Sequence, residues 1–280
     1  MGTDSINPGP ELLPPDADLN APSPARRRRP PWAYAPATYL LVGINCLVFL
    51  AMTVHGINPM SPSPEQLLNC GADNAGSVLI NGEWWRIVTA MFVHVGILHL
   101  ATNMWCLWNL GLLAEPLMGS VGVLAVYILT GAAGNLLSTL YNGLSPLHDS
   151  SGAVYFPVGA GASGAVFGIA GALIVLLKSH LLPVPPQELH KLRRSVIYFA
   201  AINLVIGFTI SLGVVAKHTG VKIDNSAHLG GVLCGLLFAA RMVPRIGSPR
   251  PLFTRRLQFS VAMVVGLLVL FGFFVAQWVG

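Results

Sequence analysis

The chain has 280 residues, of which 54% are hydrophobic and 10% are charged, and its mean hydropathy is +0.65. Soluble domains average about 25% charged residues, so this composition excludes an ordinary soluble protein. The four cysteines lie within apolar runs or alone in a loop, which indicates unpaired thiols and not a disulfide framework.

Residues 1–35 are rich in proline and contain no apolar segment. They end in the basic run Arg26–Arg29, and no hydrophobic core follows it closely enough for a cleaved signal peptide. Four acidic residues in the same stretch argue against a mitochondrial presequence. We therefore expect a disordered cytoplasmic tail that ends in an orientation signal.

Long apolar segments fill the rest of the chain, and several reach the roughly 20 residues that a helix needs to cross a bilayer. The sequence thus predicts an all-α polytopic membrane protein. The segment 178–194, with its prolines and basic residues, is expected to be a cytoplasmic connector. The expected spanning helices are residues 36–55, 95–114, 119–141, 159–177, 195–216, 225–243 and 257–278.

The basic residues predict the orientation. With the N-terminus in the cytoplasm, thirteen of the sixteen Lys and Arg residues lie inside, and only Arg86, Lys217 and Lys222 lie outside. An odd number of spans then places the C-terminus outside. The net charge of +5 is explained by topology, so no nucleic-acid partner is expected. The short tail without a targeting signal favours a bacterial inner membrane.

A serine among small residues opens the expected fourth span, in the stretch from Gly159 to Gly168. Gly164 and Gly168 form a pair of small residues four apart, which is common where two membrane helices pack closely. Helix packing alone explains such a stretch. Ser163 is a candidate nucleophile only if a base lies at the same depth in the membrane.

Candidate bases are few, because the expected spans contain almost no ionisable residues. His99 and His228 lie within the second and sixth spans, and His94 lies at the outer edge of the second. A histidine in the membrane is either a functional group or a hydrogen-bonding residue between helices. The second, fourth and sixth spans all run from outside to inside, so His99, Asn103, Ser163 and His228 are expected at one depth in the outer leaflet.

Spacing within the helices adds geometry to this convergence. His99 and Asn103 are four residues apart and share a helix face. Gly231 and Gly235 share the face of His228, so a neighbouring helix can approach closely beneath the imidazole. The glycine pair of the fourth span offers the matching surface, and such packing would bring the serine within hydrogen-bond reach of the histidine.

Several motifs together resemble the rhomboid intramembrane serine proteases. The resemblance covers residues 36–243, as a six-helix catalytic core, and 244–280 look like the cytoplasmic linker and additional seventh helix of the six-plus-one forms. The motifs are Gly161-Ala162-Ser163-Gly164, the run from Ala227 to Gly235, His94-x4-His99-x3-Asn103, and Trp85-Arg86, which looks like the family's first-loop signature.

The resemblance implies a Ser–His dyad without metal or cofactor. Ser163 would attack the scissile carbonyl, and His228 would act as general base and then as general acid. The oxyanion would be held by the side chains of His99 and Asn103 and by the N–H of Ser163. Supporting roles are implied for His94, Phe167, Gly161, Gly164, Gly231, Gly235, Trp85 and Arg86. Phe167 stands where many relatives have tyrosine.

Asp224 lies one turn before His228, at the aqueous boundary, where it could orient the imidazole; the expected spans contain no acidic residue. The expected partners are the lipid bilayer and single-span membrane proteins, cut near the outer face; the oligomeric state is not predicted. One alternative is an inactive relative that binds membrane helices. Others are a transporter that relays protons through histidines, and a zinc site formed by His94, His99 and His228.

Overall fold

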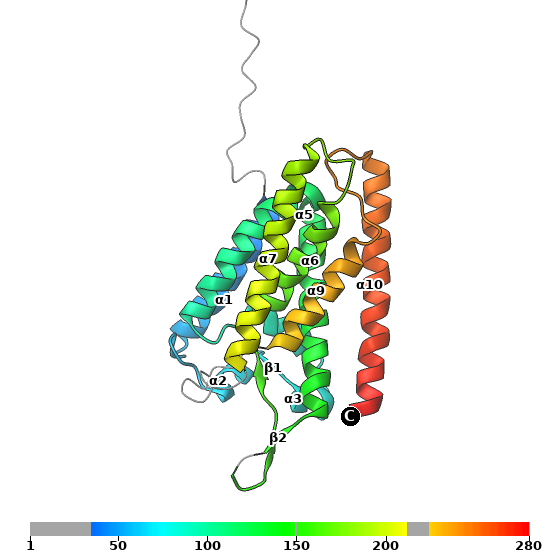
Figure 1. Ribbon diagram of the computed structural model, residues 1–280. Coiled ribbons are helices and arrows are strands. Elements are labelled where there is room, and N and C mark those ends of the chain that lie inside the picture. The colour runs from blue at the N-terminus through cyan, green and yellow to red at the C-terminus, as the bar shows by residue number, and fades with distance from the viewer. Residues whose placement is uncertain (1–34, 149, 212–223, 280) are drawn as a thin grey trace, which may run out of the picture. The chain divides into compact units, whose positions relative to one another are not determined.

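The structure is a computed structural model that describes residues 35–148, 150–211 and 224–279, with no side-chain description for residues 207–211 and 279. Most of the expected N-terminal tail, together with Lys217 and Lys222, lies outside these ranges. The described chain is mostly helical, as the composition predicts. The helices are aligned side by side, and short strands and helices gather at one end of them (Figure 1).

Helix α1 spans Pro36–Val54, and its first residues are hydrogen bonded to a carboxylate from another helix. The N–H groups of Ala37 and Thr38 each donate to Glu115 over 2.9 Å, and the Thr38 hydroxyl donates over 2.7 Å. The first N–H groups of a helix have no partner within it, so the carboxylate satisfies them. Glu115 is 1% exposed. From the sequence we expected Glu115 to lie just beyond the span 95–114, whereas helix α5, Ile97–Leu144, continues past this residue and its side chain is buried.

Helix α5, Ile97–Leu144, takes the place of two expected spans. The helical backbone is interrupted at Gly119, where φ is 69° and ψ is 165°. Glycine adopts such a positive φ without a steric penalty, so the chain changes direction over one residue and needs no longer connector. The spans expected over 95–114 and 119–141 therefore correspond to the two helical segments of α5 on either side of Gly119.

The later helices differ from expectation mainly at their starts. Helix α6 spans Ser163–Leu176 and begins after a strand. Helix α7, Pro186–Ser211, begins nine residues before the expected start at 195, so about half of the predicted connector is helical. Helices α9 and α10 span Asn225–Ala239 and Arg250–Val279. The expected seventh span thus starts earlier, because the segment with its basic residues is helical too.

Short elements form an outer segment at one end of the helices (Figure 1). Strand β1 pairs antiparallel with β4, and β2 pairs antiparallel with β3. The β1–β4 pair joins a segment before α5 to the residues just before α6. The elements are α2 Pro64–Asn69, β1 Asp73–Asn74, α3 Ala75–Leu79, α4 Arg86–Thr89, the 3-10 helix η2 Ala90–Phe92, β2 Leu147–His148, β3 Val154–Tyr155 and β4 Val158–Gly159.

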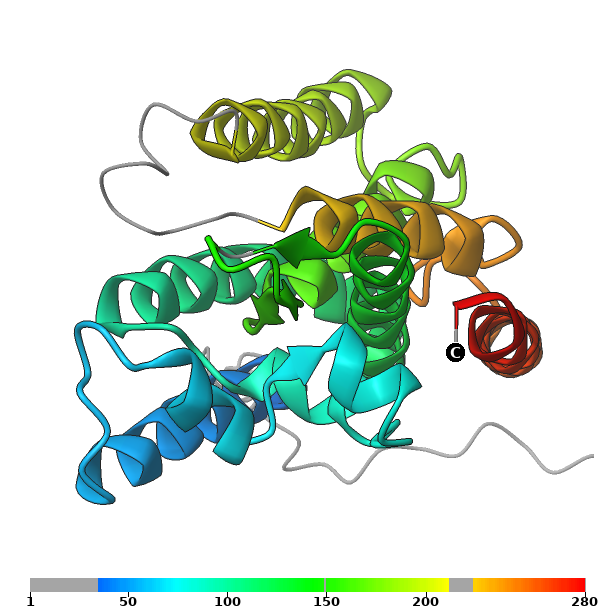
Figure 2. The same ribbon diagram turned by 90° about the horizontal axis from the view of Figure 1, so that it is seen from below.

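Helix α6 lies at the centre of the core. Eleven of its fourteen residues are buried, as expected for a helix that is apolar on every side. Viewed along the helices, α1, α7 and α10 lie at the edges (Figure 2). Among the described residues, α1, α5 and α10 are long and apolar enough to cross a membrane, and α6 and α9 are shorter apolar helices. These helices support an integral membrane protein; the six-plus-one count stays a prediction.

Candidate active site

Helices α6 and α9 contact each other through backbone atoms, with no side chain between them at the glycines. A Cβ atom on Gly231 would lie 2.0 Å from the carbonyl oxygen of Gly164, and one on Gly235 would lie 2.0 Å from that of Gly168. Real atoms do not approach so closely, so any larger residue would separate the helices. The four glycines singled out from their spacing therefore form one continuous contact, which begins one residue after Ser163.

The first two turns of α9 also touch the second half of α5. A Cβ atom on Gly134 would lie 2.5 Å from the carbonyl oxygen of Ala227, and one on Gly230 would lie 2.9 Å from that of Ala133. Three helices thus meet at backbone distance immediately beside His228. Sequence reasoning missed Gly134, although its run of small residues, Gly131–Gly134, carries the same signal of close packing.

His228 is 7% exposed and its imidazole stacks on the ring of Phe167, with centroids 4.3 Å apart and planes inclined by 18°. Phe167 lies one helical turn below Ser163, so the ring and the serine share one face of α6. The Nδ1 atom of His228 is buried without a hydrogen-bond partner. No hydrogen bond joins Ser163 to His228 in the described part of the chain, although the sequence predicted that packing would bring them within reach.

Asp224 hydrogen bonds to the start of α9 and not to the imidazole. Its carboxylate caps α9 by accepting from the N–H of Ala227 over 3.0 Å, and it also accepts from the hydroxyls of Ser226 and Ser138. The only hydrogen bond between Asp224 and His228 among the described residues joins their backbones. No carboxylate–imidazole hydrogen bond joins the two residues in the described ranges, so an orienting role of Asp224 stays a prediction.

His99 faces the loop that precedes Ser163. A Cβ atom on Gly161 would lie 2.5 Å from the His99 ring, and the backbone of Gly161 has a φ of 130°, so only glycine fits here. The Nδ1 atom of His99 is buried without a partner. The Asn103 side chain donates to the His99 carbonyl oxygen over 2.9 Å, which leaves its second N–H available.

His94 is fully buried and is hydrogen bonded to the same loop. Its Nε2 atom accepts from the N–H of Ala162 over 3.4 Å, so its Nδ1 carries the proton that is shared with the Phe92 carbonyl oxygen over 3.3 Å. Burial, assisted by the nearby His99 ring, lowers the pKa of His94 to about 3. A neutral His94 with both nitrogens engaged fixes the residue next to Ser163.

Trp85 and Arg86 organise the outer segment at a distance from the serine. The guanidinium of Arg86 lies 4.4 Å from the centre of the Trp85 ring and donates to Glu83 over 2.6 Å. It also donates to the carbonyl oxygens of Leu68 and Ala72, over 2.6 Å and 3.0 Å. This one buried cation therefore ties α2, the approach to β1 and α4 together.

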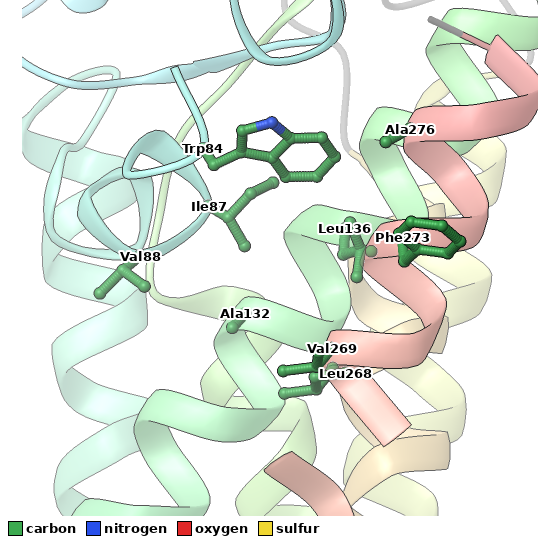
Figure 3. Close-up of a pocket in the computed structure, with 10 residues that line it drawn as sticks. Trp84, Ile87, Val88, Ala132, Leu136, Leu268, Val269, Phe273 and Ala276 are labelled. Atoms are coloured by element: carbon green, nitrogen blue, oxygen red, sulfur yellow. The ribbon is translucent and has the colours of Figure 1, made fainter. Parts of the chain in front are cut away.

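A separate cavity of about 400 Å³ lies between the second half of α5, helix α10 and the outer segment (Figure 3). Its lining is apolar, with Trp84 across one end and Leu268 and Phe273 on the α10 side (Figure 3). No group for acid–base or nucleophilic chemistry lines it. In addition, no three His, Cys, Asp or Glu side chains within the described ranges lie close enough together to hold a metal, so the zinc alternative gains no support.

The helical membrane fold and this serine–histidine site define a class of polytopic protein, and comparison with known families identifies it. Residues 81–245 match the model of the Rhomboid domain. The chain belongs to the rhomboid family, and the resemblance seen in its motifs is confirmed.

Three relatives show the extent of the similarity. The chain is 34% identical over 235 residues to "Rhomboid protease GluP" of Bacillus subtilis, covering 82% of this chain and 39% of that protein. It is 31% identical over 208 residues to "Rhomboid protease AarA" of Providencia stuartii, covering 72% and 70%. It is 33% identical over 193 residues to "RHOMBOID-like protein 6, mitochondrial" of Arabidopsis thaliana, covering 68% and 55%. The chain therefore spans well under half of the first of these relatives.

Proposed function

We propose that this chain is an intramembrane serine endopeptidase that uses Ser163 and His228 as a dyad. The observation that carries the proposal is the backbone contact between Gly164 and Gly231, each within one turn of a proposed catalytic residue. Family membership supports the same chemistry, because two of the relatives are named as proteases. The presence of both residues disfavours the inactive helix-binding relative.

In the proposed mechanism, the Ser163 hydroxyl attacks the scissile carbonyl while His228 accepts its proton. His228 then donates that proton to the leaving amine, and water resolves the acyl-enzyme by the same route. The stacked Phe167 ring holds the imidazole in place. No carboxylate of the described residues touches the imidazole, so the site fits a dyad and not a triad. The Ser–His hydrogen bond forms when the Ser163 side chain rotates, as such bonds tighten in substrate complexes.

The developing oxyanion has three proposed donors. Ser163 is the first residue of α6, where N–H groups lack partners within the helix, so its N–H is available. The free N–H of Asn103 and the unpartnered His99 ring supply the side-chain donors. Removal of one such donor typically costs about 3 kcal/mol of transition-state stabilisation.

The proposed substrates are single-span membrane proteins that are cut near the outer membrane face. A peptide carbonyl within a membrane helix is hydrogen bonded, so the segment must unwind before Ser163 can attack it. Cleavage is therefore proposed after a small residue, with Gly, Pro or Ser within the next turns. The distribution of Lys and Arg supports a cytoplasmic N-terminus and an outer C-terminus, and the C-terminal end of α10 lies at the end of the outer segment (Figure 1).

The proposed organisation keeps a cytoplasmic tail over 1–35, the catalytic core over 36–243, and a linker with a seventh membrane helix over 244–280. The proposed location is a bacterial inner membrane.

The test of function compares purified wild-type protein with Ser163→Ala in detergent, using a single-span substrate and gel analysis. Cleavage by the wild type alone supports the proposal, whereas equal turnover by Ser163→Ala overturns it.

A further inference from the structure

A buried polar cluster that the proposed mechanism does not use lies at the outer end of the site. Its centre is Asp73 in β1, which is 3% exposed. Thr139 of α5 donates to the Oδ2 atom of Asp73 over 3.0 Å, and the Oδ1 atom is buried without any partner. A buried carboxyl group with one donor and one unpartnered oxygen is poorly solvated, which disfavours its charged form.

A second carboxylate, that of Asp224, lies close to the first, next to strand β4. Gly159 of β4 is the residue opposite Asp73 in the β1–β4 ladder. A Cβ atom on Gly159 would lie 3.8 Å from the Oδ2 atom of Asp224 and 4.0 Å from that of Asp73. The two carboxyl groups therefore both lie next to Gly159, and a Cβ atom here would be in van der Waals contact with each.

The two acids differ in their hydrogen bonds. Asp224 accepts from the hydroxyls of Ser138 and Ser226 and from the N–H of Ala227. Asp73 has one donor. Asp73 is buried and Asp224 is half-buried, so a charge on Asp73 is poorly solvated and lies close to a second carboxyl group, both of which favour its protonated form. Asp73 is therefore the member of the pair whose charged form is disfavoured.

Charges on the other surrounding elements do not change this assignment. Helix α5 presents only neutral groups, Ser138, Thr139 and Asn142, which donates to Ser138. Arg86 of α4 favours the anion weakly and is already paired with Glu83. Burial, and to a lesser extent the charge of Asp224, raise the pKa of Asp73 to about 7.

The cluster touches the approach to each member of the proposed dyad. Strand β4 ends at Gly159, and four residues later the chain reaches Ser163. Asp224 caps α9, and its backbone carbonyl accepts from the N–H of His228. A displacement within the cluster is therefore transmitted to the serine through β4 and to the histidine through the first turn of α9.

We propose that Asp73 is a positioning residue whose protonated carboxyl group keeps β4 and the start of α9 in register, and so sets the alignment of Ser163 with His228. When Asp73 loses its proton, a second negative charge is buried beside Asp224, the two segments separate, and cleavage slows. This inference rests on the proposed protease function. It predicts that cleavage slows at alkaline pH because Asp73 loses its proton, and not because a dyad residue titrates.

The test replaces Asp73 with asparagine, which has the same shape as the protonated acid and cannot ionise. We expect the kcat of the wild type to be lower at about pH 9 than at about pH 6. The ratio of kcat at the higher pH to kcat at the lower pH should be at least about threefold greater in Asp73→Asn than in the wild type. The acid side of the profile should not move. Glu65→Gln, an exposed acid of α2 on the same outer segment, is the matched control and should keep the wild-type profile.

A second variant guards against misfolding of the first. Thr139→Val removes the donor that stabilises the Asp73 anion, so its alkaline decline should shift to higher pH, in the same direction as in Asp73→Asn. Superimposable profiles of the wild type and either folded variant would overturn the inference.

Thermal unfolding gives a readout that does not need activity. A raised pKa in the folded state stabilises the protein below the ordinary pKa of an aspartate, and this stabilisation is lost as the pH rises through about 7. The Tm of the wild type should therefore fall across this range more steeply than that of Asp73→Asn. A wild type that cleaves nothing refutes the protease function, whereas a cleaving wild type with an unchanged Asp73→Asn profile and Tm slope refutes only the role of Asp73.

Discussion

Phe167 and His228 form a stacked pair, with ring centroids 4.3 Å apart, that joins the helix of the serine to the helix of the histidine. The pair restricts the rotation of the imidazole without contributing a polar group to it. We therefore expect phenylalanine and tyrosine to serve equally well here, because the stacking surface of the two rings is the same.

Replacement of this ring should separate catalysis from folding. Phe167→Tyr should retain kcat within about twofold, whereas Phe167→Ala should lower it about tenfold or more, because the imidazole is no longer oriented. Phe167→Ala also leaves a cavity and should lower the Tm. Phe253→Ala, a buried phenylalanine of α10, is the control for the cavity alone and should lower the Tm with a smaller change in kcat. Equal losses of kcat in both alanine variants would remove the orienting role.

The dyad should behave as a unit. Ser163→Ala and His228→Ala should each abolish cleavage of a single-span substrate, and the double variant should be no worse than either single one. Initial rates and circular dichroism measured on the same preparations separate lost chemistry from lost structure. Additive losses in the double variant would show that the two residues act independently.

The contact between α6 and α9 should tolerate no added carbon. In Gly231→Ala, the new Cβ would overlap the Gly164 carbonyl oxygen, so we expect a lower Tm and loss of activity. Gly266→Ala in α10 is the matched control, because nothing lies within 4 Å of the added atom. This control should be neutral or slightly stabilising, since alanine favours a helix over glycine by about 1 kcal/mol. A folded and active Gly231→Ala would show that the helices can separate without consequence.

Glu115 should matter for stability more than for chemistry. Its carboxylate accepts from Ser120 as well as from the start of α1, and Glu115→Gln turns an NH2 group towards these donors. We expect a loss of about 1–3 kcal/mol in the free energy of unfolding, with kcat retained below the new Tm. Glu188→Gln disrupts only an exposed ion pair with Lys191 and should change the stability little. Similar Tm values for both variants would argue against the capping role.

Topology can be measured independently of activity. A reporter that is active only outside the cytoplasm should be active when fused after Gly280 and silent when inserted near Glu188. The opposite pattern would place Ser163 in the inner leaflet and contradict the proposed site of cleavage near the outer face.

The sequence predicted the features that repeat along a helix. Gly231 and Gly235 follow His228 at helical spacing, and a matching pair follows Ser163, so the contact between the two helices could be inferred from periodicity. The apolar lengths likewise predicted helices close to α1, α6 and α9. Such patterns are local, and each can be recognised within a single segment of the chain.

The features that sequence analysis missed depend on pairs of distant residues. Strands β1 and β4 are two residues long, too short for any alternating pattern, and their register is set by the helices around them. Asp73 looks like an ordinary loop acid until β4 and the cap of α9 enclose it. Glu115 was missed because its burial requires α1 to begin beside it, which no pattern near residue 115 indicates.

The bare backbone contact of α6 with α9 has a consequence for how a substrate enters. Helices that touch through side chains can slide as those side chains change rotamer, but the contact of Gly164 with Gly231 contains no side chain that could adapt. The contact therefore fixes the distance between the α6 and α9 backbones next to the serine and the histidine. In the proposed reaction, a membrane helix would enter by movement of elements at the edge of the bundle and not by separation of α6 from α9.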